Sequence, residues 1–332
     1  MYAFFLILLL LLAYTLWHNR AVRVNIRPLT QSKSMAARGV LALMIVFHHY
    51  GTELSLPPTQ LFYPIGAMAV GVFFLMSGYG LSYSYAHRGD DYLRHFLRKR
   101  LLKIIFPFSL AILAWQVEEM CLYGSENLPH RWSMLAQGLT RGWLPFSWYV
   151  WVALYYYLVF YLVYRFIHSP RLRWVALFVG WGLQVTWVNV VLHWDDYWYI
   201  SSHLFVLGML YQRFEPQLQR INAFVWMMLM AVLAQLIRID WHSSEVFFNT
   251  AFALLFVCGI TLVDVRSKVL HFLGTISYEV YLTQGFGLFA LKETALPVAL
   301  KALFALIFNV VLAYGLHLVV EKLRSRFSLF HA

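Results

Sequence analysis

Charged residues are scarce in this sequence. They make up 12% of its 332 residues, whereas soluble domains carry about 25%. The chain also lacks any long polar stretch, which excludes a separate soluble domain. Only two cysteines occur, Cys121 and Cys258, and they lie far apart on separate apolar segments. This pattern indicates neither a disulfide nor a metal site, so we expect no bound metal.

Acidic residues are fewer than basic ones. The chain has 15 Asp and Glu residues against 26 Lys and Arg residues, a formal net charge of +11. Such a balance can indicate nucleic-acid binding. Here the basic residues fall in short gaps between apolar stretches, which is the positive-inside pattern of a membrane protein. We therefore expect membrane lipids, and no nucleic acid, as partners.

Long apolar runs dominate the chain, which is 61% hydrophobic. A run of about 20 apolar residues crosses a bilayer as a helix. We therefore predict an all-α, polytopic membrane bundle. Residues 1–17 have no basic start and no small-residue cleavage site, so we interpret them as an uncleaved span. About eleven spans are expected, near residues 1–17, 35–52, 64–86, 101–122, 147–167, 174–194, 197–213, 221–239, 246–264, 269–291 and 297–320.

The gaps between these spans predict the orientation. Of the 26 Lys and Arg residues, 21 fall in alternate gaps, in the span ends beside those gaps or in the C-terminal tail, and 5 fall on the opposite side. The basic side faces the cytoplasm. The N-terminus is therefore expected outside and the C-terminus inside the cytoplasmic (inner) membrane.

Two basic side chains on one apolar helix are the main candidates for chemistry. Arg38 and His49 are eleven residues apart, which is about three helical turns and about 16 Å along the axis. Both therefore share one face. Ionisable groups inside a span are costly and often functional. Arg38 would pair with an anionic donor while His49 acts as general base; alternatively, Arg38 is a snorkelling anchor and His49 a structural residue.

Two neighbours of His49 have two interpretations each. His48 points about 100° around the helix and is either a packing residue or the reactive histidine. Glu53 lies four residues beyond His49 and could orient the imidazole. It could equally be a solvated acid at the outer surface.

Three further segments carry polar or small residues. In GVFFLMSGYG, the residues Ser77, Gly78 and Tyr79 allow either close helix packing or ligand contact. In FLRKRLLKIIFP, the cations Arg98, Lys99, Arg100 and Lys103 suit phosphates, although topology signalling and anionic lipid explain most such clusters.

The tenth expected span contains SYEVYLTQ, with Glu279 and Tyr281. An acid in an apolar segment needs a partner. Glu279 is expected either to pair with a basic residue of another span or to line a reaction cavity.

Together these segments resemble the acyltransferase 3 family of integral-membrane acyltransferases, over about residues 35–320. The most specific element is an arginine, ten residues and a histidine, matched by Arg38 and His49. GVFFLMSGYG and FLRKRLLKIIFP resemble further family signatures, and SWYVWVALYYYL, FVLGMLYQR and LGTISYEVYL resemble looser ones. Lys103 stands where an arginine is common, and Gln284 where many members have histidine.

The resemblance implies a division into an extra N-terminal helix with a basic linker (1–34) and a membrane acyltransferase domain (35–332). It implies transfer of an acyl group, often acetyl, from cytoplasmic acyl-CoA to a hydroxyl of a cell-surface glycan or lipid-linked sugar. His49, Arg38 and Glu53 would be catalytic. The donor would be held by Arg38, Arg98, Arg100, Lys103, Ser77, Gly78 and Tyr79, with His48, Glu279 and Tyr281 near the cavity.

Two other functions fit the polar residues within the spans. One is a transporter in which they form a proton or substrate path, although no inverted repeat is visible. The other is a non-catalytic partner in a polysaccharide-export system. For the enzyme, a separate extracytoplasmic transferase or a second copy of the chain is a possible partner.

Overall fold

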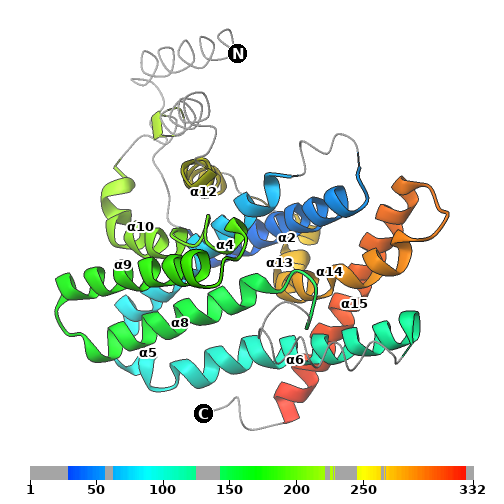
Figure 1. The fold of residues 1–332 in the computed structure, drawn as a ribbon. Helices are drawn as coiled ribbons and strands as arrows, with labels where there is room; N and C mark the ends of the chain where they lie inside the picture. The colour runs from blue at the N-terminus through cyan, green and yellow to red at the C-terminus, as the bar shows by residue number, and fades with distance from the viewer. Residues whose placement is uncertain are drawn as a thin grey trace. The chain divides into compact units, whose positions relative to one another are not determined.

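Every regular element that the structure describes is a helix. The structure, a computed structural model, describes residues 29–56, 63–124, 143–220, 225–226, 228, 245–262, 265 and 267–326 (Figure 1). The α-helices in these ranges are α2 (Gln31–Glu53), α4 (Ile65–Arg88), α5 (Asp91–Arg94), α6 (Phe96–Tyr123), α8 (Trp148–Phe166), α9 (Pro170–Thr186), α10 (Leu204–Leu218), α12 (Glu245–Leu262), α13 (Lys268–Thr275), α14 (Ser277–Lys292) and α15 (Val298–Arg326).

Six helices in the described ranges are long and apolar enough to cross a membrane. They are α4, α6, α8, α9 with its π-helical continuation η2 (Trp187–Val191), α12 and α15. These correspond to six of the predicted spans, and they confirm a multi-pass, all-helical membrane protein. The prediction for 1–17 and most of that for 221–239 lie outside the described residues. The total of about eleven and the orientation of the termini remain predictions.

The three other predicted spans that lie in the described ranges, 35–52, 197–213 and 269–291, contain helices but do not form single long apolar helices. Residues 35–52 lie within α2, which is less apolar because it carries Arg38, His48 and His49. The segment 197–213 is divided between a 3₁₀ turn, η3 (Asp196–Trp198), and the start of α10. The segment 269–291 is interrupted at Ile276, where α13 ends and α14 begins. α10 and α14 are therefore shorter than the roughly 20 residues of a typical span.

The chain divides into two compact units that interleave along the sequence. The first unit contains residues 1–41, 67–87 and 181–274, and the second contains residues 42–66, 88–180 and 275–332. α2 therefore contributes its first part to one unit and its second part to the other. The predicted boundary between residues 34 and 35 lies within the first two turns of α2.

Glycines allow close helix packing in the first unit. Gly39 of α2 lies directly against the carbonyl of Leu270 in α13, and Gly274 of α13 lies against the carbonyl of Met35 in α2. A side chain at either glycine would overlap the facing backbone. Within a membrane the hydrophobic effect does not drive helices together, so their association depends on close packing. Small residues allow that packing.

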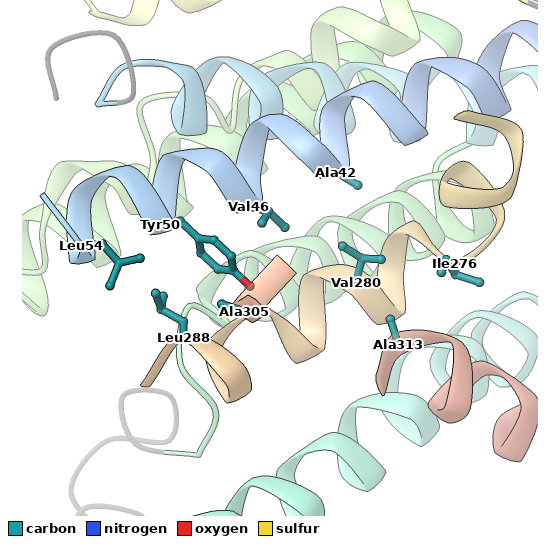
Figure 2. Packing of buried hydrophobic residues seen from close by; sticks show 9 residues of the cluster. All are labelled: Ala42, Val46, Tyr50, Leu54, Ile276, Val280, Leu288, Ala305 and Ala313. Carbon is teal, nitrogen blue, oxygen red and sulfur yellow. The ribbon is translucent and has the colours of Figure 1, made fainter. Parts of the chain in front are cut away.

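The second unit is centred on a core made by α2, α14 and α15. Figure 1 shows α14 beside α15, and these two helices pack along much of their length. Figure 2 shows the apolar side chains at their junction with α2. The buried members of this core are Ala42, Val46, Tyr50, Leu54, Ile276, Val280, Leu288, Ala305 and Ala313.

Candidate functional site

The imidazole of His49 is held against an aromatic ring in the second unit. Its centroid lies 3.7 Å from that of Phe146, and the two planes are inclined by 23°. The ring of His48 meets His49 edge-on at 4.7 Å. His49 therefore has a fixed plane rather than a freely rotating ring, which is what a group that transfers protons or acyl groups needs.

Phe146 belongs to a turn that precedes α8, and its backbone is strained. Its φ of +62° is unusual for a residue other than glycine. The hydroxyl of Tyr281 donates a hydrogen bond to the Phe146 carbonyl. The Phe289 ring stacks with Phe146 at 5.9 Å, and a side chain added at Gly285 would lie 3.1 Å from Pro145. α14 therefore holds this turn over His49.

We expect the Tyr281→Phe variant to lose about 1–3 kcal/mol of stability, because the Phe146 carbonyl would lose its donor. We also expect acyl-transfer activity to fall, since the turn that holds His49 would loosen. Thermal unfolding and turnover would be measured on the same preparations. Tyr155→Phe is the control, because it removes a bond to the Gly180 carbonyl; stability alone should fall there. Equal activity losses in both variants would contradict the role given to Tyr281.

Glu53 forms an ion pair at the end of α2. Its carboxylate lies 2.8 Å from the ammonium of Lys292 in α14. Lys301 of α15 donates a 2.7 Å hydrogen bond to the Lys292 carbonyl. These contacts connect α2, α14 and α15. The charge of the Glu53 carboxylate is balanced by Lys292, so the structure gives it a role that does not involve His49.

His48 lies against the start of α4. Its ring is in contact with Gly66, where any larger side chain would overlap the imidazole, and it meets the Tyr63 ring edge-on at 6.4 Å. These contacts match the interpretation of His48 as a packing residue.

The cations at the start of α6 differ in their surroundings. Arg98 and Lys103 are exposed. Arg100 instead donates a 2.9 Å hydrogen bond to the Tyr92 hydroxyl and lies 5.8 Å from the centre of the Tyr157 ring. Arg98 and Lys103 can therefore meet a ligand directly, while Arg100 is held by aromatic residues.

α15 brings another cation to this basic group. The guanidinium of Arg324 donates a 3.3 Å hydrogen bond to the Lys103 carbonyl and pairs with Glu321 at 2.8 Å. One residue beyond Lys103, the Ile104 carbonyl accepts a 3.0 Å bond from the Tyr278 hydroxyl of α14. The basic end of α6 is thus attached to the same helix that covers His49.

Arg38 lies in the part of α2 that belongs to the first unit, and its side chain is exposed. α2 runs unbroken from Gln31 to Glu53, which confirms that Arg38 and His49 share one helix.

The GVFFLMSGYG segment lies in α4 and packs within the first unit. Gly78 lies directly against the Phe205 carbonyl of α10. The Tyr79 hydroxyl donates to the buried Glu215 carboxylate, with distances of 2.9 and 3.0 Å to its two oxygens. Ser77 is half-buried. Gly78 and Tyr79 therefore have structural contacts here, in agreement with the helix-packing alternative, while their contact with a donor remains a prediction.

Glu279 has the partner that its apolar segment predicted. Its carboxylate lies 3.1 Å from Nδ1 of His317 in α15, and both side chains are largely buried. Glu279 therefore has a contact on another helix, while its place at a reaction cavity remains a prediction. Breaking such a contact on one side leaves a buried polar group unsatisfied, which is costly.

A comparison with known families shows which family the chain belongs to. Residues 35–318 match the family model of an acyltransferase domain, acyltransferase 3. The chain belongs to the acyltransferase 3 family. No match was found among the curated proteins or the solved structures. With six long apolar helices in its described ranges, this family member is a multi-pass membrane acyltransferase. Within the described ranges, no group of three His, Cys, Asp or Glu side chains is arranged to hold a metal ion.

Three residues of this acyltransferase were missed by sequence reasoning. Phe146 lies in an irregular turn, and no local pattern gives its positive φ or its stacking on His49. His317 had a visible signal, since it is a lone ionisable residue in the apolar run of α15. Arg324 was counted only as a topology charge, because its proximity to Lys103 depends on tertiary packing.

Proposed function

We propose that this acyltransferase moves an acyl group, most simply acetyl, from cytoplasmic acyl-CoA to a hydroxyl of a cell-surface glycan or lipid-linked sugar. Membership of the family supports acyl transfer. The donor, the acceptor and the cytoplasmic entry are inferred from the resemblance and from the distribution of charge.

The observation that carries the proposal is the fixed imidazole of His49. It stacks on Phe146, and the turn that contains Phe146 is hydrogen-bonded to Tyr281. Histidine titrates near neutral pH in its unperturbed state, so it can both accept and return a proton. A defined ring plane is required if the same nitrogen is to meet an acceptor hydroxyl repeatedly.

Cations on the same unit suit the polyanionic end of CoA. Arg98 and Lys103 are exposed, and guanidinium and ammonium groups bind phosphate strongly. We assign the phosphates to these two residues and to Arg324.

α14 links this basic group to the region of His49. Tyr278 contacts α6 at Ile104, and Tyr281 contacts the turn over His49. These tyrosines are three residues apart, which is about 4.5 Å along a helix axis. A donor held by its phosphates could therefore extend its narrow pantetheine arm along α14 toward the imidazole.

In the direct route, His49 removes the proton from the acceptor hydroxyl as the oxygen attacks the thioester carbonyl. The new C–O ester bond forms, the C–S bond breaks, and the imidazolium returns its proton to the leaving thiolate, giving CoA thiol. In the second route, a nitrogen of His49 attacks the thioester carbonyl, the C–S bond breaks, and the proton that the imidazole releases goes to the leaving thiolate. The acceptor hydroxyl then attacks the acyl-imidazole, the C–N bond breaks, and the hydroxyl proton returns to the imidazole. Both routes release one thiol for each ester formed.

The proposed function is tested with purified full-length protein in liposomes, acetyl-CoA and a glycolipid fraction from the host cells. We expect thiol release that depends on both substrates and is matched by ester formation. Movement of the glycolipid across the bilayer without CoA and without ester formation would instead establish transport. Neither ester nor thiol in the presence of both substrates would contradict the assignment.

A further inference from the structure

A row of contacts runs from the imidazole of His49 to an ion pair at the end of α2. The centroid of the His49 ring lies 3.7 Å from that of Phe146, and the Phe146 centroid lies 5.9 Å from that of Phe289 in α14. Nζ of Lys292 lies 5.9 Å from the centre of the Phe289 ring and 2.8 Å from the Glu53 carboxylate. Glu53 and His49 belong to the same helix. The row therefore begins and ends on α2.

One face of α14 carries the middle of this row. Tyr281, Gly285 and Phe289 are spaced by four, so they lie on one helix face. All three meet the turn before α8, through a hydrogen bond, a close contact with Pro145 and a stacked ring respectively. Lys292 follows Phe289 by three residues, which places it on the same side of the helix. Lys292 therefore ends the face of α14 that holds this turn.

The end of α2 is an unusual place for an acid. A helix C-terminus carries about half a negative charge, and Glu53, the last residue of α2, adds a carboxylate to it. The last turn of α2, residues 50–53, contains no lysine or arginine. Figure 2 shows Leu54 and Leu288 near one another at this end of the core, where α14 approaches α2. The compensating charge comes from α14, through Lys292.

Negative charge at this end of α2 bears on His49. The imidazole belongs to the residue four before Glu53, which is about 6 Å along the helix axis. An uncompensated carboxylate at that position would favour the charged imidazolium, whereas a general base must be neutral before it accepts a proton. The Lys292 and Glu53 side chains are only 37% and 29% exposed, so solvent screens their pairing less than that of a surface pair.

Other ionisable side chains also surround the row. They are His48 of α2, which meets His49 edge-on, Tyr281 of α14, Glu118 and Glu119 of α6, which follow the Trp115 that meets Phe289, and Lys301 of α15. Lys292 contacts both the Phe289 ring and the Glu53 carboxylate. It can therefore act on the row from its end, both by packing and by charge.

We propose that Lys292 is a positioning residue for His49. It holds Phe289 against Phe146 through its contact with the ring, and Glu53 anchors it there. It also cancels the Glu53 charge, so that the imidazole is available as a base. This inference rests on the proposed function for the role of His49, whereas the stacking of the rings can be measured without catalysis.

The first test measures the stacking by NMR. It uses the full-length protein in lipid nanodiscs, with the histidines labelled with ¹³C at Cε1, and the His49 signal is assigned by its loss in His49→Ala. The ring current of Phe146 displaces the signal of a stacked imidazole. We expect Lys292→Met to move the His49 signal toward the position of an unstacked histidine. Lys292→Arg keeps a cation over Phe289, so its signal should stay near the wild-type position.

The second test measures the pH dependence of kcat for acyl transfer in liposomes. Lys292→Met leaves the Glu53 carboxylate uncompensated, so the midpoint of the profile should rise by about half a pH unit or more. Its plateau kcat should fall about tenfold or more, because the imidazole is less well placed. Glu53→Gln leaves the ammonium uncompensated, and its midpoint should fall. Lys292→Arg should retain the wild-type profile.

Lys301→Met is the matched control. Lys301 also links α14 and α15 at this end of the unit, but its bond is to the Lys292 carbonyl. This variant should lower the Tm while the His49 signal and the midpoint of the profile stay in place. A merely structural Lys292 would give the same result as Lys301.

Two results would overturn the proposal. One is a His49 signal at the same position in the wild type and in Lys292→Met. The other is a midpoint that Lys292→Met leaves unchanged or moves to lower pH. If Lys292→Met does not fold, Glu53→Gln decides, and an unchanged midpoint there overturns the proposal. If the wild type forms neither ester nor thiol while Lys292→Met still moves the His49 signal, the positioning contact is retained and the proposed function fails, so the two failures are distinguishable.

Discussion

The His49→Ala variant is expected to lower kcat for acyl transfer by about 10²–10⁴-fold, the usual contribution of a general base. The reason is local, because the His49 imidazole stacks on Phe146, the residue that α14 holds in place. The rate of thiol release from acetyl-CoA with the glycolipid fraction would be measured. The KM for acetyl-CoA should change little, since the phosphate contacts lie elsewhere.

The matched control is His48→Ala, because His48 is the adjacent imidazole but packs on Gly66. It should lower stability more than turnover. Acid-quenched protein incubated with labelled acetyl-CoA alone separates the two routes. Label on His49 indicates the acyl-histidine route, and its absence with full turnover indicates the direct route. Full activity of His49→Ala would refute both.

The second large effect is expected from Gly78→Ala, which should prevent α4 from packing against α10. The added methyl group would overlap the Phe205 carbonyl, and Gly208 of α10 lies equally close to the Leu75 carbonyl of α4. Both facing atoms belong to the backbone and cannot rotate away. We expect a loss of about 3 kcal/mol, at the upper end of the usual cost of overpacking, measured by thermal unfolding and by the yield of monodisperse protein.

Gly80 provides the control for this prediction within the same motif. A methyl group there would meet no atom within 4 Å. Gly80→Ala should therefore be neutral or stabilise α4 by about 0.5–1 kcal/mol, since alanine is the better helix former. Equal stability of the two variants would show that the glycines of GVFFLMSGYG do not serve helix packing.

The sequence pattern predicted those features that depend on local periodicity. Residue spacing gives the helical register of α2 and the six apolar helices among the described residues. The cost of burying a polar group predicts that Glu279 needs a partner. Close helix packing at Gly78 was likewise one of the predicted alternatives, because glycines in an apolar helix permit it.

Other features depend on contacts between distant segments. The stacking of Phe146 on His49 requires a turn about a hundred residues away in the chain to reach α2. The pairing of Glu53 with Lys292 and the position of Arg324 beside Lys103 have the same origin. The break at Ile276 was missed because residues 269–291 form one mainly apolar run without a proline, while the direct contact of Gly274 with Met35 is a tertiary feature.

The central claim is that His49 is required for the transfer of an acyl group from CoA to a hydroxyl at the cell surface. The most direct measurement supplies membranes of cells that express the chain with [¹³C]acetyl-CoA and follows the label by mass spectrometry of the surface glycans. The account predicts a labelled ester on a glycan hydroxyl with the wild-type chain and none with His49→Ala. Equal labelling of the glycans with the wild-type chain and with His49→Ala would contradict the claim. Release of CoA thiol without labelled glycan in either sample would contradict it as well.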